Sequence, residues 1–365
     1  MQIGGRVIGE GRYGCAVIPP FLCNGEQGKD RYAADRKDKV GKLAIQSQAM
    51  TEIEVSNTLR KIPRIEQYFI LNDPKACVPF INDAAIDDWS SCMASKQKNN
   101  TMFRKENIVQ ITSAYGGKAM NSLQTTDLHP RSFHYFKFFS QLLEAGAIMT
   151  LHNVCHYDLH KPNILLDKQG VARIIDFGMS FLTKNITQET LNERWKYYDP
   201  IYDNEPPEVT VMTGLGKKIP LQKVIDETVK IKPIYKNIQM ILLVPNQDSK
   251  EELQTFFKQS DSASKRNWPK TWQHFWPGFD SWAIAAILLN LLKIQLTFPE
   301  FTNSELWLKK GSLVYKILKQ MLVSNPFYRI DCVESLSLWN PESDVLKDSD
   351  SWIYEKQKQK NLLAK

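Results

Sequence analysis

The first third of the chain alternates short apolar runs with polar stretches that are rich in glycine and proline. Runs of Val, Ile, Ala and aromatic residues bounded by turn residues are typical of β-strands, and they predict strands at residues 15–18, 40–45, 68–71 and 108–112. Residues 51–59 instead carry apolar side chains at helical spacing, with Val55 and Leu59 on one face. This part is therefore predicted to be a sheet with one helix.

Helical periodicity dominates the rest of the chain. Residues 133–151 place Phe, Leu and Ile on one face of a predicted helix. Residues 164–166 and 171–175 are short apolar runs around a polar turn, which predicts a β-hairpin. The most apolar stretch, residues 282–292, is shorter than the ~20 residues that span a membrane, so we expect a buried helix. The two parts together predict an α+β fold.

Two polar stretches interrupt these patterns and are interpreted as insertions. The first covers about residues 72–107 and is expected to form a surface loop. The second covers about residues 209–275 and includes an apolar run at 238–244 that predicts a strand. It would be either a docking surface for substrate or a surface excursion without a separate role. Residues 343–365 read as a basic, polar C-terminal tail.

Composition is that of a soluble globular chain, with 365 residues of which 42% are hydrophobic and 24% charged. The net charge of +7 predicts no specific binding to nucleic acid. The six cysteines show no C-x-x-C spacing, so we expect reduced thiols rather than a zinc ribbon or a disulfide framework. The first residues do not resemble a signal peptide, and we expect a cytoplasmic protein without membrane association.

Candidate chemistry is concentrated at residues 156–163. Asp158, Lys161 and Asn163 put a carboxylate, a cation and a carboxamide on one short loop. The hairpin that follows is expected to return Asp176 beside Asn163. Oxygen ligands of this kind suit hard cations such as Mg²⁺. The loop therefore predicts a metal-assisted reaction.

Near the N-terminus, Gly9, Gly11, Gly14 and Val17 form the pattern G-x-G-x-x-G-x-V. Two unrelated architectures use this pattern to bring backbone N–H groups against phosphate. A dinucleotide-binding fold would begin a helix within the glycines. Here a β-type run follows at residues 15–18, so strand, loop and strand is the predicted arrangement.

These motifs resemble those of the protein kinase family. His156, Asp158 and Asn163 match its H-x-D…N signature, and Asp176 begins D-F-G eighteen positions after Asp158. Three further landmarks resemble the family in the expected order: Pro206-Pro207-Glu208, Asp280 before an apolar helix, and Arg329. Glu208 would pair with Arg329, and Asp280 would brace the catalytic loop.

The resemblance implies a two-lobed kinase fold. Residues 1–112 would form a small antiparallel β-sheet lobe with one helix, and residues 113–342 a mainly helical lobe, with ATP in the cleft. It also implies that Asp158 accepts or orients the proton of the substrate hydroxyl. Asn163 and Asp176 would hold Mg²⁺, or Mn²⁺ in its place, on the phosphates of ATP.

The resemblance assigns further residues to ATP. Lys42 stands where the family has its phosphate-binding lysine, although Lys37 and Lys39 lie nearby. Glu52 would face inward with the buried helix positions and hold Lys42 through an ion pair. Tyr115 lies in the segment that resembles the hinge whose backbone binds adenine.

Three positions depart from the family pattern. Tyr157 replaces an arginine that would bind a phosphorylated activation segment, here residues 179–208. Catalysis is therefore predicted not to depend on phosphorylation of Thr183, Thr187 or Thr190. His160 stands where Ser/Thr kinases usually have lysine, and Lys161, one position later, is the candidate to reach the γ-phosphate. The sequence Asp-Leu-His also resembles kinase-like small-molecule phosphotransferases.

Protein serine/threonine kinase activity on protein substrates is the predicted function. The alternatives are a small-molecule phosphotransferase and a pseudokinase that serves as a nucleotide-binding scaffold. A tyrosine kinase is disfavoured because its loop forms are absent, and a zinc site would have to use His152, Cys155 and His156. The pattern Gly14-Cys15, Pro19-Pro20 and Cys23 resembles divergent Ser/Thr kinases of large nucleocytoplasmic DNA viruses, which would place the protein in host cytoplasm or the virion.

Overall fold

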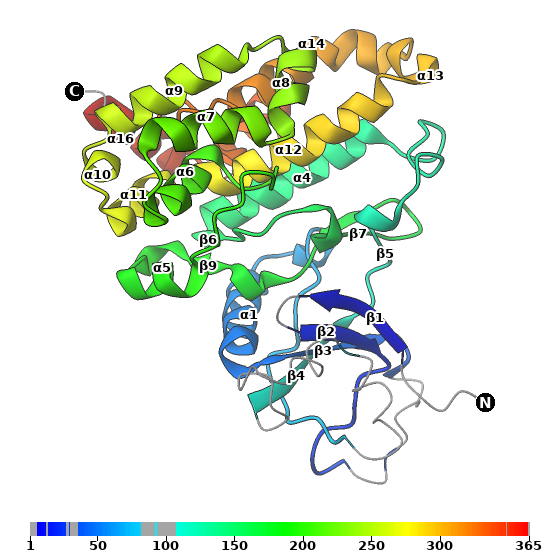
Figure 1. Ribbon diagram of the computed structural model, residues 1–365. Helices are drawn as coiled ribbons and strands as arrows, with labels where there is room; N and C mark the ends of the chain where they lie inside the picture. Colours follow the sequence, from blue (N-terminus) through cyan, green and yellow to red (C-terminus); the bar gives the residue numbers. More distant parts are fainter. Residues whose placement is uncertain are drawn as a thin grey trace. The chain divides into compact units, whose positions relative to one another are not determined.

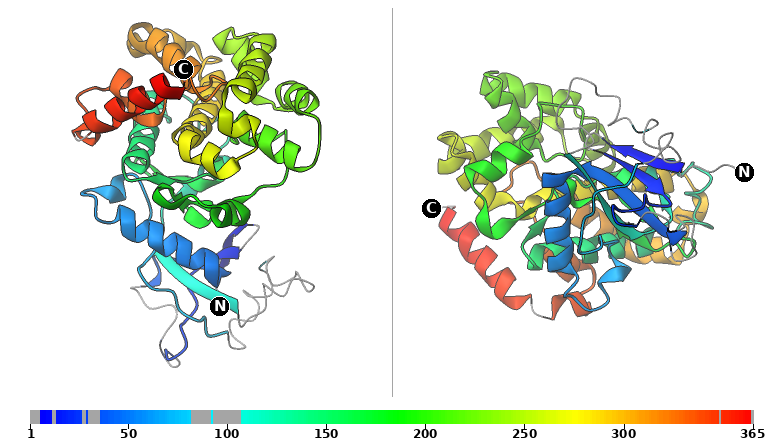
Figure 2. Two further views of the ribbon diagram at one scale, coloured as in Figure 1. Left: turned by 90° about the vertical axis from the view of Figure 1, so that its left-hand side faces the viewer. Right: turned by 90° about the horizontal axis from the view of Figure 1, so that it is seen from below.

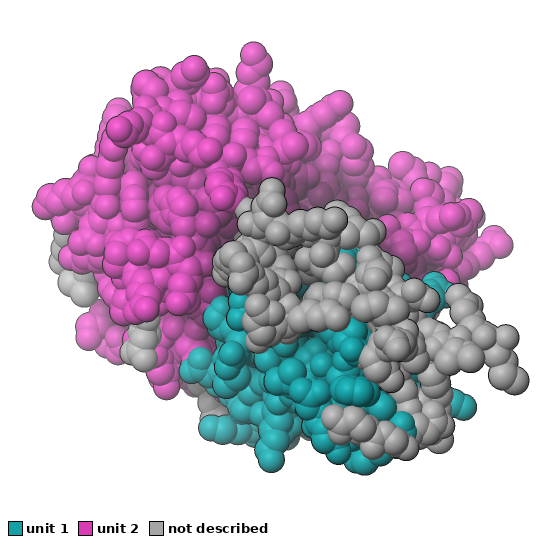
Figure 3. Space-filling view, turned by 60° about the horizontal axis from the view of Figure 1, so that its bottom comes forward, with its two compact units in different colours: residues 1–117, 175–179 teal, residues 118–174, 180–365 magenta. Residues whose placement is uncertain are grey.

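The computed structural model describes residues 6–11, 14–26, 29, 36–81, 92, 107–347 and 349–363. The chain divides into two compact units, which Figure 3 colours separately. Unit 1 comprises Met1–Gly117 with Ile175–Met179, and unit 2 comprises Lys118–Ile174 with Ser180–Lys365.

Unit 1 contains a four-stranded antiparallel sheet in the order β1-β2-β3-β4 (Figure 1). Helix α1 (Gln46–Leu59) follows the third strand directly and buries Ile53 and Val55. The sheet and the single helix confirm the prediction for this part, although α1 begins five residues before the predicted start at residue 51. The strands are β1 (Arg6–Gly11), β2 (Gly14–Ile18), β3 (Lys39–Ile45) and β4 (Ile108–Ala114).

Residues 68–71 do not form the predicted strand. They follow a 3-10 turn, η2 (Ile65–Gln67), and their apolar character reflects the burial of Phe69, which is 1% exposed. The next residues lie along β4 instead, where Cys77 and Gln110 exchange backbone hydrogen bonds of 2.9 and 2.8 Å. Most of the predicted insertion, residues 82–91 and 93–106, lies outside the described residues.

Two disulfide bonds in unit 1 correct the expectation of reduced thiols. Cys15 is bonded to Cys92, and Cys23 is bonded to Cys77. The partners are 77 and 54 residues apart in sequence, so the pairing is a property of the folded chain and leaves no spacing motif. Both bonds attach the polypeptide after residue 71 to β2 and the loop that follows it. The remaining cysteines are buried free thiols, Cys155 and Cys332.

Unit 2 begins with short strands that carry the predicted hairpin. Ile164 pairs with Ile174 and Leu166 with Ala172, which confirms that residues on either side of the polar turn are adjacent strands. A second pair, β6 with β9, joins Val154 to Leu182. The strands are β5 (Lys118–Ala119), β6 (Val154–Cys155), β7 (Ile164–Leu166), β8 (Ala172–Ile174) and β9 (Phe181–Leu182).

The core of unit 2 is built around α12 (Pro277–Gln295), which packs on α4 (Tyr135–Leu151). Within the described part of the chain, α12 is the one helix that is long and apolar enough to cross a membrane by length and composition. Of its apolar window, 72% is buried inside the protein, as in the core helix of a globular unit. This confirms the buried helix predicted for residues 282–292.

The region predicted as an insertion at 209–275 folds as a series of helices, and the strand predicted at 238–244 is wrong. Helix α8 (Ile234–Leu242) occupies most of that run, because Ile234, Ile238 and Leu242 recur every four residues and are buried on one helix face. The other helices of the region are α6 (Pro207–Gly216), α7 (Leu221–Ile231), α9 (Asn246–Gln259), α10 (Asp261–Ser264) and α11 (Trp268–Phe275).

The segment predicted as a polar tail forms helix α16 (Asp350–Leu363), drawn in red in Figure 2. Trp352 packs its ring 5.7 Å from that of Trp276, and Lys356 donates a hydrogen bond of 2.6 Å to the buried Asp331. The tail is therefore part of unit 2. The helices that precede it are α13 (Pro299–Thr302), α14 (Glu305–Met321) and α15 (Cys332–Trp339), followed by the turn η10 (Asp344–Leu346).

Candidate active site

The glycines predicted to bind phosphate lie in the β1–β2 hairpin of unit 1. Gly9 pairs with Ala16 and Gly11 with Gly14. A side chain at Gly14 would put its Cβ atom 1.9 Å from the backbone oxygen of Leu43, so only glycine lets β2 approach β3 this closely. Gly14 is therefore needed for the close packing of β2 on β3, whether or not the hairpin also binds phosphate.

Val17 and Tyr115, also predicted to contact ATP, differ from each other in burial. Val17 is fully buried in β2. Tyr115 has 51% of its surface exposed, and its backbone N–H donates to the oxygen of Asp38 at 2.8 Å. The tip of the glycine loop, Arg12 and Tyr13, lies outside the described residues.

The structure brings Lys42 together with two carboxylates of unit 1. Lys42 Nζ donates to Glu52 Oε1 at 2.5 Å and to Asp176 Oδ1 at 2.6 Å. Glu52 is 1% exposed, and its Oε2 accepts from Asn72 Nδ2 at 3.0 Å. Burial opposes ionisation of Lys42, but the charges of Asp176 and Glu52 outweigh it and raise the pKa of the lysine well above its usual value. Lys42 is therefore a fixed, protonated ammonium group, as phosphate binding requires.

Asp158, the candidate base, is held by groups from two parts of unit 2. Lys196 Nζ lies 3.0 Å and Tyr202 Oη 3.2 Å from its Oδ1, and His160 Nε2 lies 3.6 Å from its Oδ2. Burial favours the neutral acid, but the His160 and Lys196 side chains outweigh this effect and lower the pKa of Asp158 well below its usual value. The Asp158 side chain is 29% exposed, so an ionised carboxylate reaches the surface here.

The backbone that presents Asp158 is braced from α12. Asp280, which is 5% exposed, accepts from His156 N at 2.7 Å and from Tyr157 N at 2.9 Å. Tyr157 has a φ of 64°, a left-handed conformation that a bulky residue adopts only under strong constraint. The two hydrogen bonds supply that constraint. Asp280 thus fixes the backbone next to Asp158, as the sequence predicted.

Asn163 belongs to the 3-10 turn η7 (Lys161–Asn163) and points back to the loop. Its Nδ2 donates to the backbone oxygen of Asp158 at 2.9 Å. For the described residues, no hydrogen bond to its amide oxygen is seen, so this atom fits a metal ligand. Lys161 is half-buried, and burial lowers its pKa, although the charge of Asp203 opposes the shift.

Asn163 in unit 2 offers an amide oxygen and Asp176 in unit 1 offers a carboxylate oxygen, and Mg²⁺ prefers ligands of both types. Mg²⁺ usually takes one or two such groups from a protein and fills its octahedron with phosphate oxygens and water. Nowhere in the described ranges do three or more His, Cys, Asp or Glu residues form a group that could hold a metal ion. Each of the two residues, taken by itself, supplies an oxygen that suits a magnesium ion arriving with a nucleotide.

Lys196 and Tyr202 were not singled out in the sequence as partners of Asp158. Tyr157 stands where the family pattern has an arginine. This missing cation was the one sequence feature that indicated a positive charge from another segment of the chain. Lys196 follows α5 (Gln188–Arg194) in the activation segment and lies 38 residues from Asp158. The contact therefore depends on the fold and has no local spacing signature.

The end of the activation segment is anchored by a buried ion pair. The two terminal guanidinium nitrogens of Arg329 donate to Glu208, Nη1 to Oε1 at 2.7 Å and Nη2 to Oε2 at 2.8 Å. The two side chains are 0% and 1% exposed. This arrangement confirms the predicted pairing and fixes the start of α6 to the helical core.

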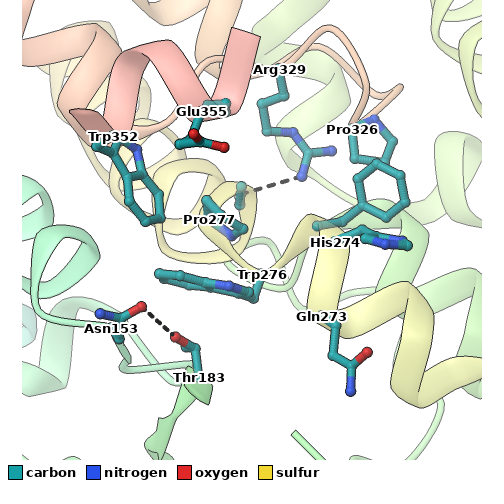
Figure 4. A pocket seen from close by; sticks show the side chains of 13 residues that line it. Asn153, Thr183, Gln273, His274, Trp276, Pro277, Pro326, Arg329, Trp352 and Glu355 are labelled. Atoms are coloured by element: carbon teal, nitrogen blue, oxygen red, sulfur yellow. Dashed lines mark hydrogen bonds between the residues drawn. The ribbon is translucent and has the colours of Figure 1, made fainter. Parts of the chain in front are cut away.

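A separate pocket of about 220 Å³ lies in unit 2 (Figure 4). Trp276 and Trp352 line it, and Asn153 and Thr183 close one side. None of the residues predicted to bind ATP, the metal ion or the substrate hydroxyl lines this pocket, although Arg329 does.

The sequence is similar to those of known protein kinases. Residues 4–339 match the family described as the protein kinase domain. The chain is 25% identical over 187 residues to CBL-interacting protein kinase 28 of Oryza sativa subsp. japonica, a match covering 51% of this chain and 35% of that protein. It is 38% identical over 76 residues to CBL-interacting serine/threonine-protein kinase 15 of Arabidopsis thaliana, covering 21% of this chain and 18% of that protein.

The chain thus spans only about a third or less of the length of these relatives. The family match, in contrast, extends over nearly the whole chain and includes both units. An antiparallel sheet region followed by a mostly helical region confirms the predicted two-lobed kinase fold. The chain belongs to the protein kinase family.

Proposed function

We propose that the protein is an ATP-dependent serine/threonine kinase that phosphorylates protein substrates and uses Mg²⁺ or Mn²⁺. The observation that carries the proposal is the state of Asp158. It is an ionised, partly exposed carboxylate on a loop that Asp280 braces through two backbone hydrogen bonds. A group in this state can accept the hydrogen bond of an incoming hydroxyl.

In the proposed reaction, Asp158 orients a Ser or Thr hydroxyl for in-line attack on the γ-phosphorus of ATP and accepts its proton. A new oxygen–phosphorus bond forms, the bond to the β-phosphate oxygen breaks, and ADP leaves. Lys42, held by Glu52, binds phosphate oxygens. Asn163 and Asp176 would hold the metal ion, which would neutralise phosphate charge when it is bound with the nucleotide. Positioning and electrostatics supply most of the rate enhancement in reactions of this class.

The choice of Ser and Thr as acceptors is supported by the relatives, one of which is named a serine/threonine-protein kinase. The landmarks Glu208 and Arg329, which form the buried ion pair, also favour a protein substrate over a small molecule. The resemblance to kinases of large DNA viruses, and the cytoplasmic or virion location it implies, belong to the same proposal. Cys15 and Cys23, which contribute to that resemblance, are both disulfide-bonded.

The experiment measures phosphate transfer from radiolabelled Mg²⁺-ATP by the wild-type protein and by Asp158→Ala. The acceptors are a panel of proteins and, in parallel, aminoglycosides and other small hydroxyl compounds. We expect transfer to protein Ser or Thr that the substitution abolishes. Transfer to small acceptors alone would establish the phosphotransferase alternative. Binding of ATP without any transfer would establish the scaffold.

A further inference from the structure

Lys196 is the one residue that contacts both the backbone and the carboxylate of the catalytic loop from the activation segment, within the described residues. Its Nζ donates to Tyr157 O at 2.8 Å and to Asp158 Oδ1 at 3.0 Å. Its side chain is 15% exposed. The ammonium group is therefore fixed at the loop rather than solvated at the end of a mobile side chain.

Aromatic rings complete the environment of this ammonium group. Lys196 Nζ lies 4.6 Å from the ring centroid of Tyr157 and 5.2 Å from that of Tyr202, both within the range of cation–π attraction. Tyr202 adds a hydroxyl bond of 3.2 Å to Asp158 Oδ1. Two residues of the activation segment thus bind the same carboxylate oxygen.

Tyr157 stands beside this ammonium group at the position where the family pattern has arginine. Its ring packs between Trp272 and Phe279, at centroid distances of 4.7 and 6.0 Å, and cannot act as a cation. In a loop with arginine here, the loop supplies the positive charge and the activation segment supplies a phosphate. In this chain the segment carries the positive charge on Lys196, and the loop supplies a ring, a carbonyl and a carboxylate.

We propose that Lys196 is the positioning residue of the transfer reaction, holding the activation segment on the catalytic loop and keeping the Asp158 carboxylate oriented without any phosphorylation. This inference rests on the proposed function. It adds that Lys196 positions the activation segment and that activity does not require its phosphorylation.

The threonines of the segment fit this interpretation. Thr187 and Thr190 form a reciprocal capping box at the start of α5. Thr183 is 8% exposed, and its backbone N–H donates to Asn153 O at 2.8 Å. These side chains help to build the segment, so a phosphate is not needed to order it.

The experiment compares the full-length wild-type protein with Lys196→Met, Lys196→Arg and the control Lys217→Met. Lys217 is also a lysine near a tyrosine ring of this region, 5.7 Å from the centroid of Tyr197, but its side chain is exposed. The readouts are kcat on a protein substrate at pH 7.5, and hydrogen exchange of the peptide covering residues 195–204 without nucleotide. The proteins are treated with phosphatase first.

We expect Lys196→Met to lower kcat at pH 7.5 by about 10- to 100-fold, because a displacement of ~1 Å at a reacting group has that effect. Its hydrogen exchange should be about 10-fold faster, while Lys196→Arg and Lys217→Met stay within about threefold of wild type in both readouts. Asp158 is faced by Lys196 and Tyr202 from the segment and by His160 from its own loop.

Unchanged exchange in Lys196→Met would overturn the inference, and so would activity equal to or above wild type, since the contact would then be neutral or inhibitory. If the methionine variant does not fold, Lys196→Gln takes its place in every comparison. A wild-type protein without any phosphate transfer would refute the proposed function instead, and hydrogen exchange would still decide whether Lys196 holds the segment.

Discussion

Replacing Asp280 by asparagine tests how the helical core controls the catalytic loop. The aspartate accepts from His156 N at 2.7 Å and Tyr157 N at 2.9 Å, one bond for each carboxylate oxygen. Asparagine has a single side-chain oxygen, and its NH₂ group would face the second backbone N–H. One buried donor therefore loses its partner, whichever way the amide is oriented.

The size of the effect follows from two opposing contributions. A lost hydrogen bond to a charged group, with the unsatisfied N–H left behind, costs about 1.5–3 kcal/mol. Burial raises the pKa of Asp280, which shows that the charged form is costly to bury, and the neutral amide avoids that cost. We expect a net loss of about 1–3 kcal/mol in the free energy of unfolding.

The substitution should also lower activity. Tyr157 is held at a φ of 64°, a conformation worth about 1–3 kcal/mol of strain in a residue other than glycine. Once a brace is lost, this residue relaxes and moves Asp158. We expect such a shift, of ~1 Å, to lower kcat by about 10- to 100-fold.

Urea denaturation and steady-state kinetics measure the two effects, with Ser281→Ala as the control. Ser281 is the next residue in α12, and its Oγ donates to Ile330 O at 2.7 Å, away from the loop. The control should lose about 1 kcal/mol of stability but keep kcat within about twofold of wild type. If Asp280→Asn kept wild-type kcat, or if Ser281→Ala lost as much activity, the loop would not depend on Asp280.

Two further substitutions test the energetics of the units separately. Glu208→Gln leaves the fully buried guanidinium of Arg329 without its carboxylate. We expect urea denaturation to show that the free energy of unfolding of unit 2 falls by about 3–5 kcal/mol. A loss below about 1 kcal/mol would contradict this expectation. The backbone N–H of Cys23 and the side chain of Lys29 lower the pKa of Glu26 from 4.5 to about 2. The Glu26 carboxylate therefore stabilises the fold fully above pH 4.5, and this stabilisation is lost as the pH falls toward 2. We expect Glu26→Gln to lower the free energy of unfolding by about 1–2 kcal/mol at pH 7, because the side chain is a quarter exposed. This deficit should shrink across the same pH window. A deficit independent of pH would contradict the assignment.

Local sequence patterns predicted those elements whose structure depends on neighbouring residues. The hairpin of β7 and β8 follows from two apolar runs around a polar turn, and β3 and α1 follow from alternation and helical spacing. The position of Glu52 on the buried face of α1, where the structure places it against Lys42, also follows from helical geometry.

Features that depend on distant residues were not predictable in this way. The disulfide partners are 77 and 54 residues apart, and no spacing motif marks them. The apolar run at 238–244 is short enough to fit either a strand or a buried helix. In the structure most of it belongs to α8, which packs against α12. Lys196 reaches Asp158 only because the activation segment folds back on the catalytic loop.

The most direct measurement of the account's central claim is identification of the residue phosphorylated by the wild-type protein and by Asp158→Asn at equal ATP saturation. We expect phosphoserine or phosphothreonine on a protein substrate, and a loss of kcat of about 10²- to 10⁴-fold in the variant, with ATP affinity nearly unchanged. Phosphate on tyrosine, or an Asp158→Asn variant as active as the wild type, would contradict it.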